Sequence, residues 1–208
     1  MYRSVRGLAV GMLFSIVLLY GPSTHAEACD ATGVELLNVI DAQIIKHSRW
    51  VSEFTQSNHT EALSAPLTSG GLVYVDAEQG VAWQVQNPIQ NTLIINQQGI
   101  NLGNGMMQST RMVSELLRAL ILGRLARLEN SFTVKGCLEA SSWRLLLYPK
   151  QEELAARISQ LKLAGEQWVN QLSVSQTNGN DIVIHFSPPQ VLEKMPDEIA
   201  VLLNVPGT

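Results

Sequence analysis

The fold of this chain is decided by residues 50–103, a series of short apolar segments separated by Gly, Asn and Pro. The segments read Trp50-Val51-Ser52-Glu53-Phe54-Thr55-Gln56, Gly70-Gly71-Leu72-Val73-Tyr74-Val75, Gly80-Val81-Ala82-Trp83-Gln84-Val85-Gln86-Asn87-Pro88, Asn91-Thr92-Leu93-Ile94-Ile95-Asn96 and Gly99-Ile100-Asn101-Leu102. β-Branched and aromatic residues bounded by turn residues are typical of strands, and the short connections indicate hairpins. We therefore expect a β-meander with a continuous apolar face.

Strand signals return in the second half of the chain. They cover residues 131–139, 142–149, 158–164, 168–176 and 181–186. Asn178-Gly179-Asn180 is a strong hairpin signal before the last of them. The next residues, Pro188-Pro189, predict the end of the regular sheet.

Helical periodicity appears in two longer segments. Residues 30–46 carry an apolar stripe that includes Val34, Leu37 and Ile40, and Asp30 or Thr32 is a suitable N-cap. Residues 106–128 predict one long helix, or two short ones broken at Gly123. This second segment is either a core helix or a lid that closes a pocket.

A short helical turn at residues 152–158 and an amphipathic segment at residues 197–203 complete the pattern. The predicted fold class is α+β. It is a curved antiparallel β-sheet, an incomplete β-barrel, with an N-terminal helix and a helical insertion covering its open, apolar side.

The first 26 residues have the three-part form of a secretory signal. Arg3 and Arg6 precede an uncharged run from Gly7 to Tyr20, and Thr24-His25-Ala26 supplies small residues for cleavage. The alternative, a retained membrane anchor, needs about 20 apolar residues, more than this run provides. We expect cleavage near Ala26, a periplasmic location, and one domain over residues 27–208 with a short tail from about residue 188.

Charge argues against a nucleic-acid-binding protein. Without Arg3 and Arg6 the 14 Lys and Arg residues fall to 12, against 18 Asp and Glu, so the mature chain carries about −6. Nucleic-acid binders normally present a basic surface.

Cys29 and Cys137 are the two cysteines of the chain. An even pair in an exported protein predicts a disulfide bond between them. Lipid attachment to Cys29 after cleavage at Ala28 is the alternative, although Ala26-Glu27-Ala28 lacks the residues that such a site prefers.

The sequence carries no recognisable catalytic, metal or cofactor motif. His47, His59 and His185 stand apart from any ligand pattern, while His25 lies in the leader. No nucleophile elbow, His-Glu-x-x-His motif or phosphate-binding glycine loop occurs. We therefore expect no enzyme activity, no metal and no cofactor.

The order of several motifs resembles the LolA-like outer-membrane lipoprotein carriers, and in particular a divergent branch of that family. The first half contributes Trp50…Phe54-Thr55-Gln56, Gly70-Gly71-Leu72, Gly80-Val81-Ala82-Trp83 and Asn87-Pro88. The second half contributes Trp143-Arg144-Leu145…Pro149, Ala156-Arg157-Ile158…Leu163-Ala164-Gly165 and Gly179-Asn180-Asp181…Phe186. The resemblance covers about residues 30–187.

The resemblance implies a monomeric periplasmic carrier. Such a carrier binds acyl chains of lipoproteins or other lipids in an apolar cavity, receives them from an inner-membrane donor and passes them to an outer-membrane acceptor. The family also uses a basic residue near the lid, for which Arg49 and Arg111 are candidates without a fixed correspondence. The alternative is a regulatory or sensor module of the same fold that docks on an envelope protein.

Strand alternation predicts which side chains line the cavity. Because a one-residue slip in register turns the whole set outward, this prediction depends on strand parity. The predicted lining residues are Trp50, Phe54, Leu72, Tyr74, Val81, Trp83, Leu93, Ile95, Leu145 and Leu147 on strands, with Leu116, Leu117, Leu120 and Ile121 on the helical insertion.

Overall fold

A computed structural model describes residues 31–96, 99–102, 105–107, 118–119, 121–122 and 124–204 of the 208-residue chain. The elements in chain order are β1 (Ala31–Thr32), α1 (Val34–Gln43), β2 (Arg49–His59), β3 (Leu67–Asp76), β4 (Gly80–Asn87), β5 (Asn91–Asn96), β6 (Gly99–Leu102), β7 (Gly105–Met107), the 3-10 helix η1 (Leu125–Asn130), β8 (Phe132–Leu138), β9 (Trp143–Pro149), α3 (Glu152–Ala155), β10 (Ile158–Gly165), β11 (Val169–Gln176), β12 (Asp181–Phe186), β13 (Gln190–Val191) and α4 (Asp197–Leu203).

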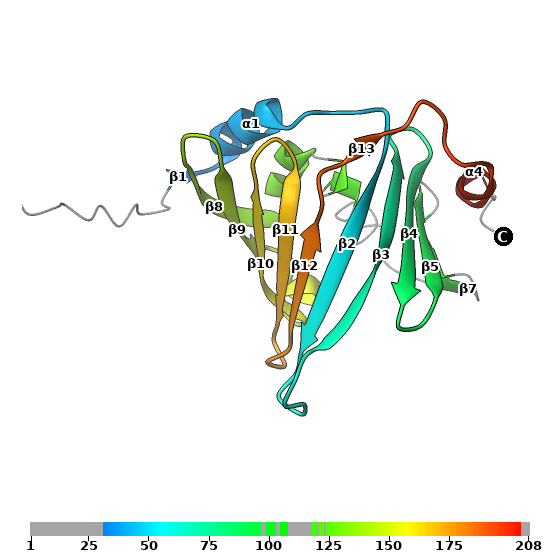
Figure 1. Cartoon of the computed structure of the whole chain (residues 1–208). Helices are drawn as coiled ribbons and strands as arrows, with labels where there is room; N and C mark the ends of the chain where they lie inside the picture. The colour runs from blue at the N-terminus through cyan, green and yellow to red at the C-terminus, as the bar shows by residue number, and fades with distance from the viewer. Residues whose placement is uncertain are drawn as a thin grey trace, which may run out of the picture.

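One strongly curved antiparallel sheet forms the body of the protein (Figure 1). Twelve strands follow in the order β1-β8-β9-β10-β11-β12-β2-β3-β4-β5-β6-β7, and β13 pairs with β2 beside β12. β1 and β7 end this order without pairing with each other, so the barrel is incomplete. The predicted fold class is confirmed.

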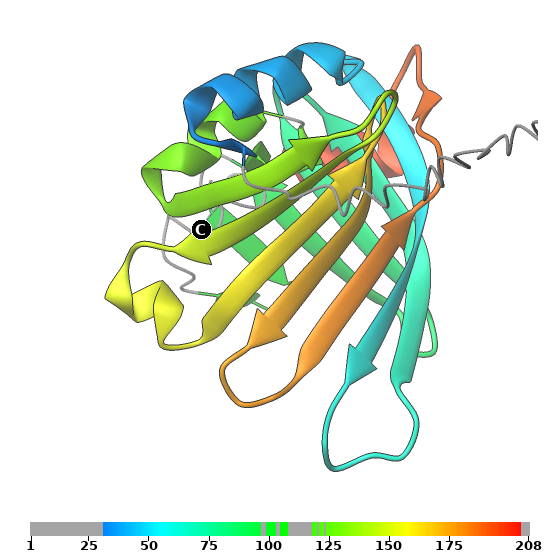
Figure 2. The same cartoon turned by 90° about the vertical axis from the view of Figure 1, so that its left-hand side faces the viewer.

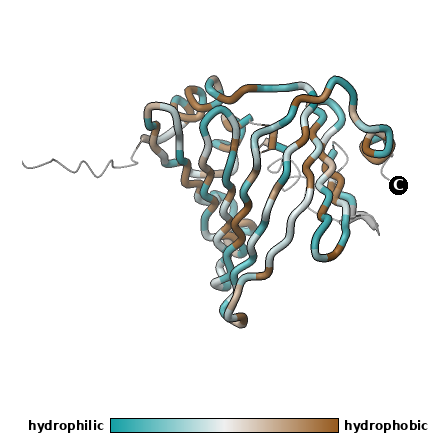
Figure 3. The backbone as a smooth tube through the Cα atoms, viewed as in Figure 1, coloured by the Kyte–Doolittle hydropathy of each residue, from teal (hydrophilic) through white to brown (hydrophobic). Residues whose placement is uncertain are grey.

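Two helices, α1 and η1, here called the helical layer, pack on the concave side of the sheet. Figure 2 shows α1 crossing one end of the strands above η1 and β8. Leu36, Leu37 and Ile40 of α1 are buried in the same apolar cluster as Leu125 and Leu128 of η1. Apolar and polar residues follow one another along the strands (Figure 3), as expected for a sheet with one face on a core.

The register of the central strands fixes which residues face this core. Val73 of β3 lies opposite Ser52 on one side and Trp83 on the other, and Val75 lies opposite Trp50 and Val81. Directly opposed residues share a face, so Trp50, Trp83 and Val81 point to the concave side together with Val73.

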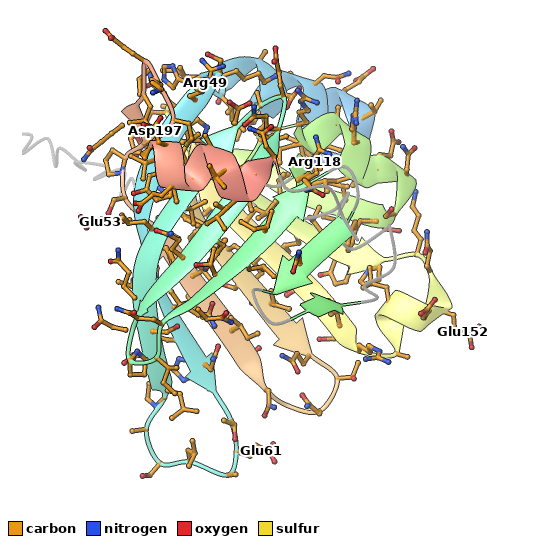
Figure 4. The ribbon with its side chains drawn as sticks, turned by 90° about the vertical axis from the view of Figure 1, so that its right-hand side faces the viewer. Arg49, Glu53, Glu61, Arg118, Glu152 and Asp197 are labelled. Atoms are coloured by element: carbon orange, nitrogen blue, oxygen red, sulfur yellow. The ribbon has the colours of Figure 1, made fainter. Side chains whose placement is uncertain are left out.

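The outer face of β3, β4 and β5 carries a second, smaller apolar cluster beneath α4. Figure 4 shows α4 lying across the outside of these strands, with Asp197 at its start. Ala82 and Ile94 are buried there against Met195, Ile199 and Leu203. The amphipathic segment expected at residues 197–203 forms the helix α4 over Asp197–Leu203.

Three predicted boundaries are wrong. Thr32 does not cap α1, because it pairs with Lys135 in β1; the N-cap is Gly33, whose φ is +89°. Met106 does not begin a helix, because β7 pairs it with Asn101 of β6. Pairing also continues past Pro188-Pro189, because β2 extends beyond the end of β12 and β13 occupies the remaining edge.

Candidate functional site

A cavity of about 100 Å³ lies at the end of the sheet where α1 connects to β2. Its walls come from that connection, from β2, from the β10–β11 hairpin, from the segment after β12 and from the residues that precede η1. The lining residues are Ile44, Ile45, Lys46, His47, Trp50, Ser52, Ala77, Ile121, Leu122, Arg124, Leu163, Trp168, Val169, Leu172, Phe186, Ser187 and Pro189. Most of these side chains are apolar, so the cavity suits a hydrocarbon chain.

Backbone hydrogen bonds hold the rim of this cavity together. The Ile45 amide donates to the Gln167 carbonyl at 2.8 Å and so joins the end of α1 to the β10–β11 turn. On the opposite side, the Ser187 amide donates to the Glu53 carbonyl at 3.0 Å. The buried Ser52 hydroxyl donates to the Ser187 carbonyl at 2.7 Å.

An aromatic cluster continues from the cavity into the core. The Trp83 ring lies 4.5 Å from the Phe54 ring, centroid to centroid, and 5.7 Å from the Phe186 ring in an edge-on arrangement. Phe186 also lines the cavity and lies opposite Phe54 in the β12–β2 register. The three rings therefore form an apolar floor made from β2, β4 and β12.

The cavity also has a polar side. Trp168 contributes an indole N–H that is buried and has no hydrogen-bond partner within the part of the chain that the structure describes. Trp143, in contrast, is fully buried and donates its indole N–H to the Glu166 carbonyl at 2.8 Å. A buried donor without an acceptor is uncommon, and this one belongs to a residue of the cavity wall.

Basic side chains line the same cavity. The wall includes Lys46, His47 and Arg124, and no Asp or Glu occurs among its described residues. The Lys46 ammonium is paired with Asp41 at 3.1 Å. Arg124 has no ion pair among the described residues, and thus its positive charge is available to a ligand.

The predicted lining residues divide into several groups. Trp50 and Ile121 line the cavity itself. Phe54, Trp83 and Leu93 belong to or pack on the surrounding core cluster. A third group is fully buried within that cluster and leaves no open surface: Val81, Ile95, Leu145 and Leu147.

The predicted parity of β3 is wrong. Val73 and Val75 face the concave core, which places Leu72 and Tyr74 on the outer face of the sheet. Tyr74 packs there against the α4 cluster. The positions Leu116, Leu117 and Leu120 lie outside the described residues, as does Arg111.

Sequence reasoning missed the contribution of β10, β11 and β12 to the wall. Leu163, Leu172 and Phe186 lie on these strands, while Trp168 and Val169 form the turn and the start of β11. Leu161 and Leu163 alternate with polar residues, and Leu163 is paired with Leu172. This alternation is a usable signal for an inward face.

Arg49 is engaged away from the cavity wall. Its Nε donates to Asp76 Oδ2 at 2.8 Å, and the carboxylate also accepts the amides of Glu78 and Gln79. Burial raises the pKa of Asp76, but these backbone amides and the Arg49 guanidinium outweigh it and hold the pKa below its ordinary value near 3.8. The pair therefore fixes the β3–β4 turn to the start of β2.

The described residues contain no group of three or more His, Cys, Asp or Glu side chains placed to hold a metal ion. His47 is half-buried at the cavity, whereas His59 and His185 are exposed. Cys137 on β8 is buried and disulfide-bonded. Cys29 lies outside the described residues, so the Cys29–Cys137 pairing stays a prediction.

None of the helices within the described ranges is long and apolar enough to cross a membrane. No curated protein sequence matches the chain.

Residues 46–199, however, match the family described as "Outer membrane lipoprotein carrier protein LolA".

Several solved structures are similar to this chain. The LolA superfamily protein NE2245 from Nitrosomonas europaea shares 10% identity at a TM-score of 0.45, over 81% of this chain and 97% of that one. A DUF1329 family protein from Desulfovibrio piger shares 11% identity at a TM-score of 0.36, over 79% and 94%. The MucA/MucB complex of Pseudomonas aeruginosa contains a chain with 8% identity at a TM-score of 0.43, over 83% and 60%.

The family match covers well over half of the chain, from the connection after α1 to the middle of α4. It includes every strand from β2 to β13 and the described wall of the cavity apart from Ile44 and Ile45. The resemblance expected from the sequence motifs is confirmed. The chain belongs to the family of the outer membrane lipoprotein carrier protein LolA.

Proposed function

We propose that this protein is a periplasmic carrier that binds acyl chains of lipoproteins or other lipids and transfers them toward the outer membrane. The observation that carries the proposal is the apolar cavity between the helical layer and the concave sheet. Its described walls hold hydrocarbon side chains and aromatic rings, with polar groups confined to a few positions. Such a surface shields a cargo from water without changing it chemically.

The energetics favour acyl chains as the cargo. Each CH₂ group removed from water contributes about 0.8 kcal/mol, so ten buried groups contribute roughly 8 kcal/mol. The cavity of about 100 Å³ is smaller than the roughly 300–1,000 Å³ of typical ligand pockets. Loading therefore requires the wall to move.

The helical layer, which adjoins the cavity wall at Ile44 and Arg124, is the part that we propose to move. Leu36, Leu37 and Ile40 of α1 pack on the core through apolar contacts, which are not directional and can be replaced by hydrocarbon. An acyl chain that takes their place restores the lost burial. Transfer then needs an acceptor that binds the chain more tightly, so that the helices return to the sheet.

We further propose that residues 1–26 are removed near Ala26 and that residues 27–208 act as a monomer in the periplasm. In this scheme an inner-membrane donor loads the carrier and an outer-membrane acceptor unloads it. Catalysis has no role in the proposal. The Cys29–Cys137 disulfide would tie the N-terminus to β8, beside β1.

Binding of a fluorescent C16 fatty acid to the purified mature protein tests the proposal. We expect saturable binding near one ligand per chain, and native mass spectrometry should show lipid or lipoprotein on protein isolated from the cell envelope. Leu163→Ala, in the cavity wall, should change the affinity. Leu161→Ala, two residues along the same strand and buried outside the wall, should not.

Both substitutions remove a buried leucine side chain and should lower the free energy of unfolding by a similar 2–5 kcal/mol, approximately. Stability therefore serves as the internal control. Absence of fatty-acid binding together with absence of any co-purifying lipid would contradict the carrier. Recovery of one stoichiometric protein partner without lipid would instead support the regulatory module.

A further inference from the structure

The polar groups of the cavity wall indicate what kind of head group the cargo carries in addition to its hydrocarbon chain. Trp168 and Arg124 approach the cavity from different parts of the chain, the β10–β11 turn and the residue before η1. Trp168 supplies a buried N–H donor that has no acceptor among the described residues. Arg124 supplies a positive charge that has no ion pair among them.

We propose that the cavity selects an acyl ligand with an acidic head group, a carboxylate or a phosphate, whose oxygens accept the Trp168 indole N–H and meet the Arg124 guanidinium. The inference rests on the proposed function, since it concerns the head of the acyl ligand that the carrier binds. It narrows that ligand to an amphiphile with a negative charge next to its chain.

The donor inventory of the wall supports an acceptor ligand. An indole offers only a donor, and a guanidinium offers only donors, so neither group satisfies the other. The Ser52 hydroxyl donates to the Ser187 carbonyl, and its oxygen does not accept the Trp168 N–H, which has no partner among the described residues. A ligand oxygen satisfies both of the remaining groups at once.

The charge balance of the wall supports an anion. Lys46, His47 and Arg124 line the cavity, and its described wall contains no Asp or Glu. Asp41, which pairs with Lys46, also accepts the Leu125 amide. The whole chain carries −4, so this concentration of basic residues runs against its general charge. An anion at the wall is attracted rather than repelled.

The arrangement also orients the ligand. Apolar side chains from β10 and β11, Leu163 and Leu172, form the wall beside the turn that carries Trp168. Beyond Phe186 the aromatic cluster with Phe54 and Trp83 continues into the core. The head therefore stays near the β10–β11 turn, and the chain extends along the concave face.

Titration of the mature protein with dodecanoic acid, dodecyl phosphate and neutral dodecanol tests the inference. We expect the two acids to bind at least tenfold more tightly than the alcohol. Trp168→Phe and Arg124→Gln should each weaken binding of the acids about tenfold and binding of the alcohol less than threefold. Arg127→Gln, an exposed arginine three residues further on, is the matched control and should change neither.

The indole N–H resonance of Trp168, assigned by its loss in Trp168→Phe, gives a readout independent of affinity. It should move downfield with dodecanoic acid, because the N–H gains an acceptor. Acetate and inorganic phosphate alone, at millimolar concentration, should leave it unchanged, because the site needs the chain. Saturable binding of these free anions would contradict the proposal that the site binds a lipid head group, and would indicate a site for small anions.

Equal binding of the acids and the alcohol, with no effect of either variant, would overturn the head-group inference while the carrier itself stands. Binding of none of the amphiphiles would contradict the proposed function as well. Thermal unfolding of each variant, followed by circular dichroism, shows whether a loss of binding results from misfolding. A variant that melts like the parent but loses only acid binding supports the inference.

Discussion

The guanidinium of Arg49 meets the carboxylate of Asp76 at a position where β2 and β3 pair directly, with Nε 2.8 Å from Oδ2. Asp76 is 2% exposed and also accepts the amides of Glu78 and Gln79, so the start of β2 and the β3–β4 turn share one buried anion. Arg49, one of the two candidates for a basic residue near the lid, is thus bound to the sheet.

This arrangement predicts an acid-sensitive fold. The folded-state pKa of Asp76 lies below its ordinary value near 3.8, so its contribution to stability is complete above that value and disappears as the pH falls through the folded pKa. Urea unfolding between pH 2 and pH 7 should show the free energy of unfolding falling below about pH 4.

Asp76→Asn should remove part of this acid dependence and lower stability at pH 7 by about 1–3 kcal/mol, because the hydrogen bonds lose their charge. Asp197→Asn is the control: Lys194 lowers the pKa of Asp197 by a hydrogen bond and its charge, but the pair is fully exposed. Water and salt screen such a pair. A similar loss of acid dependence in both variants would contradict the role assigned to Asp76.

The central hairpin predicts a severe effect of one added methyl group. A Cβ at Gly71 would lie 1.9 Å from the Gln84 carbonyl oxygen, a backbone atom that cannot rotate away. Gly71→Ala should therefore force β3 and β4 apart and cost about 1–3 kcal/mol or more.

Gly70→Ala is the neighbouring control, because its Cβ would lie 3.1 Å from the nearest atom, the Phe54 carbonyl oxygen. Chemical denaturation should rank Gly71→Ala well below Gly70→Ala in stability. Equal losses at the two positions would show that the bulge between them absorbs the methyl group.

The strands of the meander could be predicted from sequence because each carries β-branched residues between turn signals. Parity was harder. Leu72-Val73-Tyr74-Val75 is apolar at every position, and the reason lies in α4, which covers the outer face of β3 and buries Tyr74 there. A strand with apolar cover on both faces shows no alternation, so only the register decides that Val73 and Val75 face the core.

Part of the site depended on tertiary contacts that no local pattern reports. The position of Trp168 next to the end of α1 comes from the bond between the Ile45 amide and the Gln167 carbonyl, 122 residues apart. Likewise, Thr32 has the chemistry of an N-cap, but pairing with β8 places it in a strand. Met106 has high helix propensity, yet it forms part of β7 because it pairs with Asn101 on the edge of β6.

The outer cluster predicts that α4 stabilises the sheet. Ile199 is fully buried between α4 and the outer face of β4 and β5, whereas Val201 on the same helix is 65% exposed. Ile199→Ala should cost about 2–5 kcal/mol, and Val201→Ala should stay within about 0.5 kcal/mol. Thermal unfolding of both variants measures the difference.

Because the α4 cluster lies on the opposite face from the cavity, folded Ile199→Ala should bind the fluorescent fatty acid as the parent does. A matching loss of ligand affinity would show that the two faces are coupled through the sheet. In that case α4 would belong to the binding machinery rather than to the scaffold.

Asp41 links α1 to η1, and we expect this link to stabilise the helical layer. Its Oδ1 accepts the Leu125 amide at 3.0 Å and its Oδ2 accepts the Lys46 ammonium at 3.1 Å, so one side chain of α1 caps η1 across 84 residues. Asp41→Ala should cost about 0.5–2 kcal/mol, as for loss of a helix cap. Lys46→Ala removes only the exposed ion pair and should cost less than about 1 kcal/mol.

Hydrogen exchange of the Leu125 amide resolves this effect, because the amide is buried and Asp41 is its acceptor. Asp41→Ala should speed its exchange about tenfold or more, whereas Lys46→Ala should leave it nearly unchanged. If the helical layer is the moving wall, Asp41→Ala should also speed both binding and release of the fluorescent fatty acid in stopped-flow measurements. Faster exchange at Leu125 with unchanged ligand kinetics would place the moving wall elsewhere than at the junction of α1 and η1.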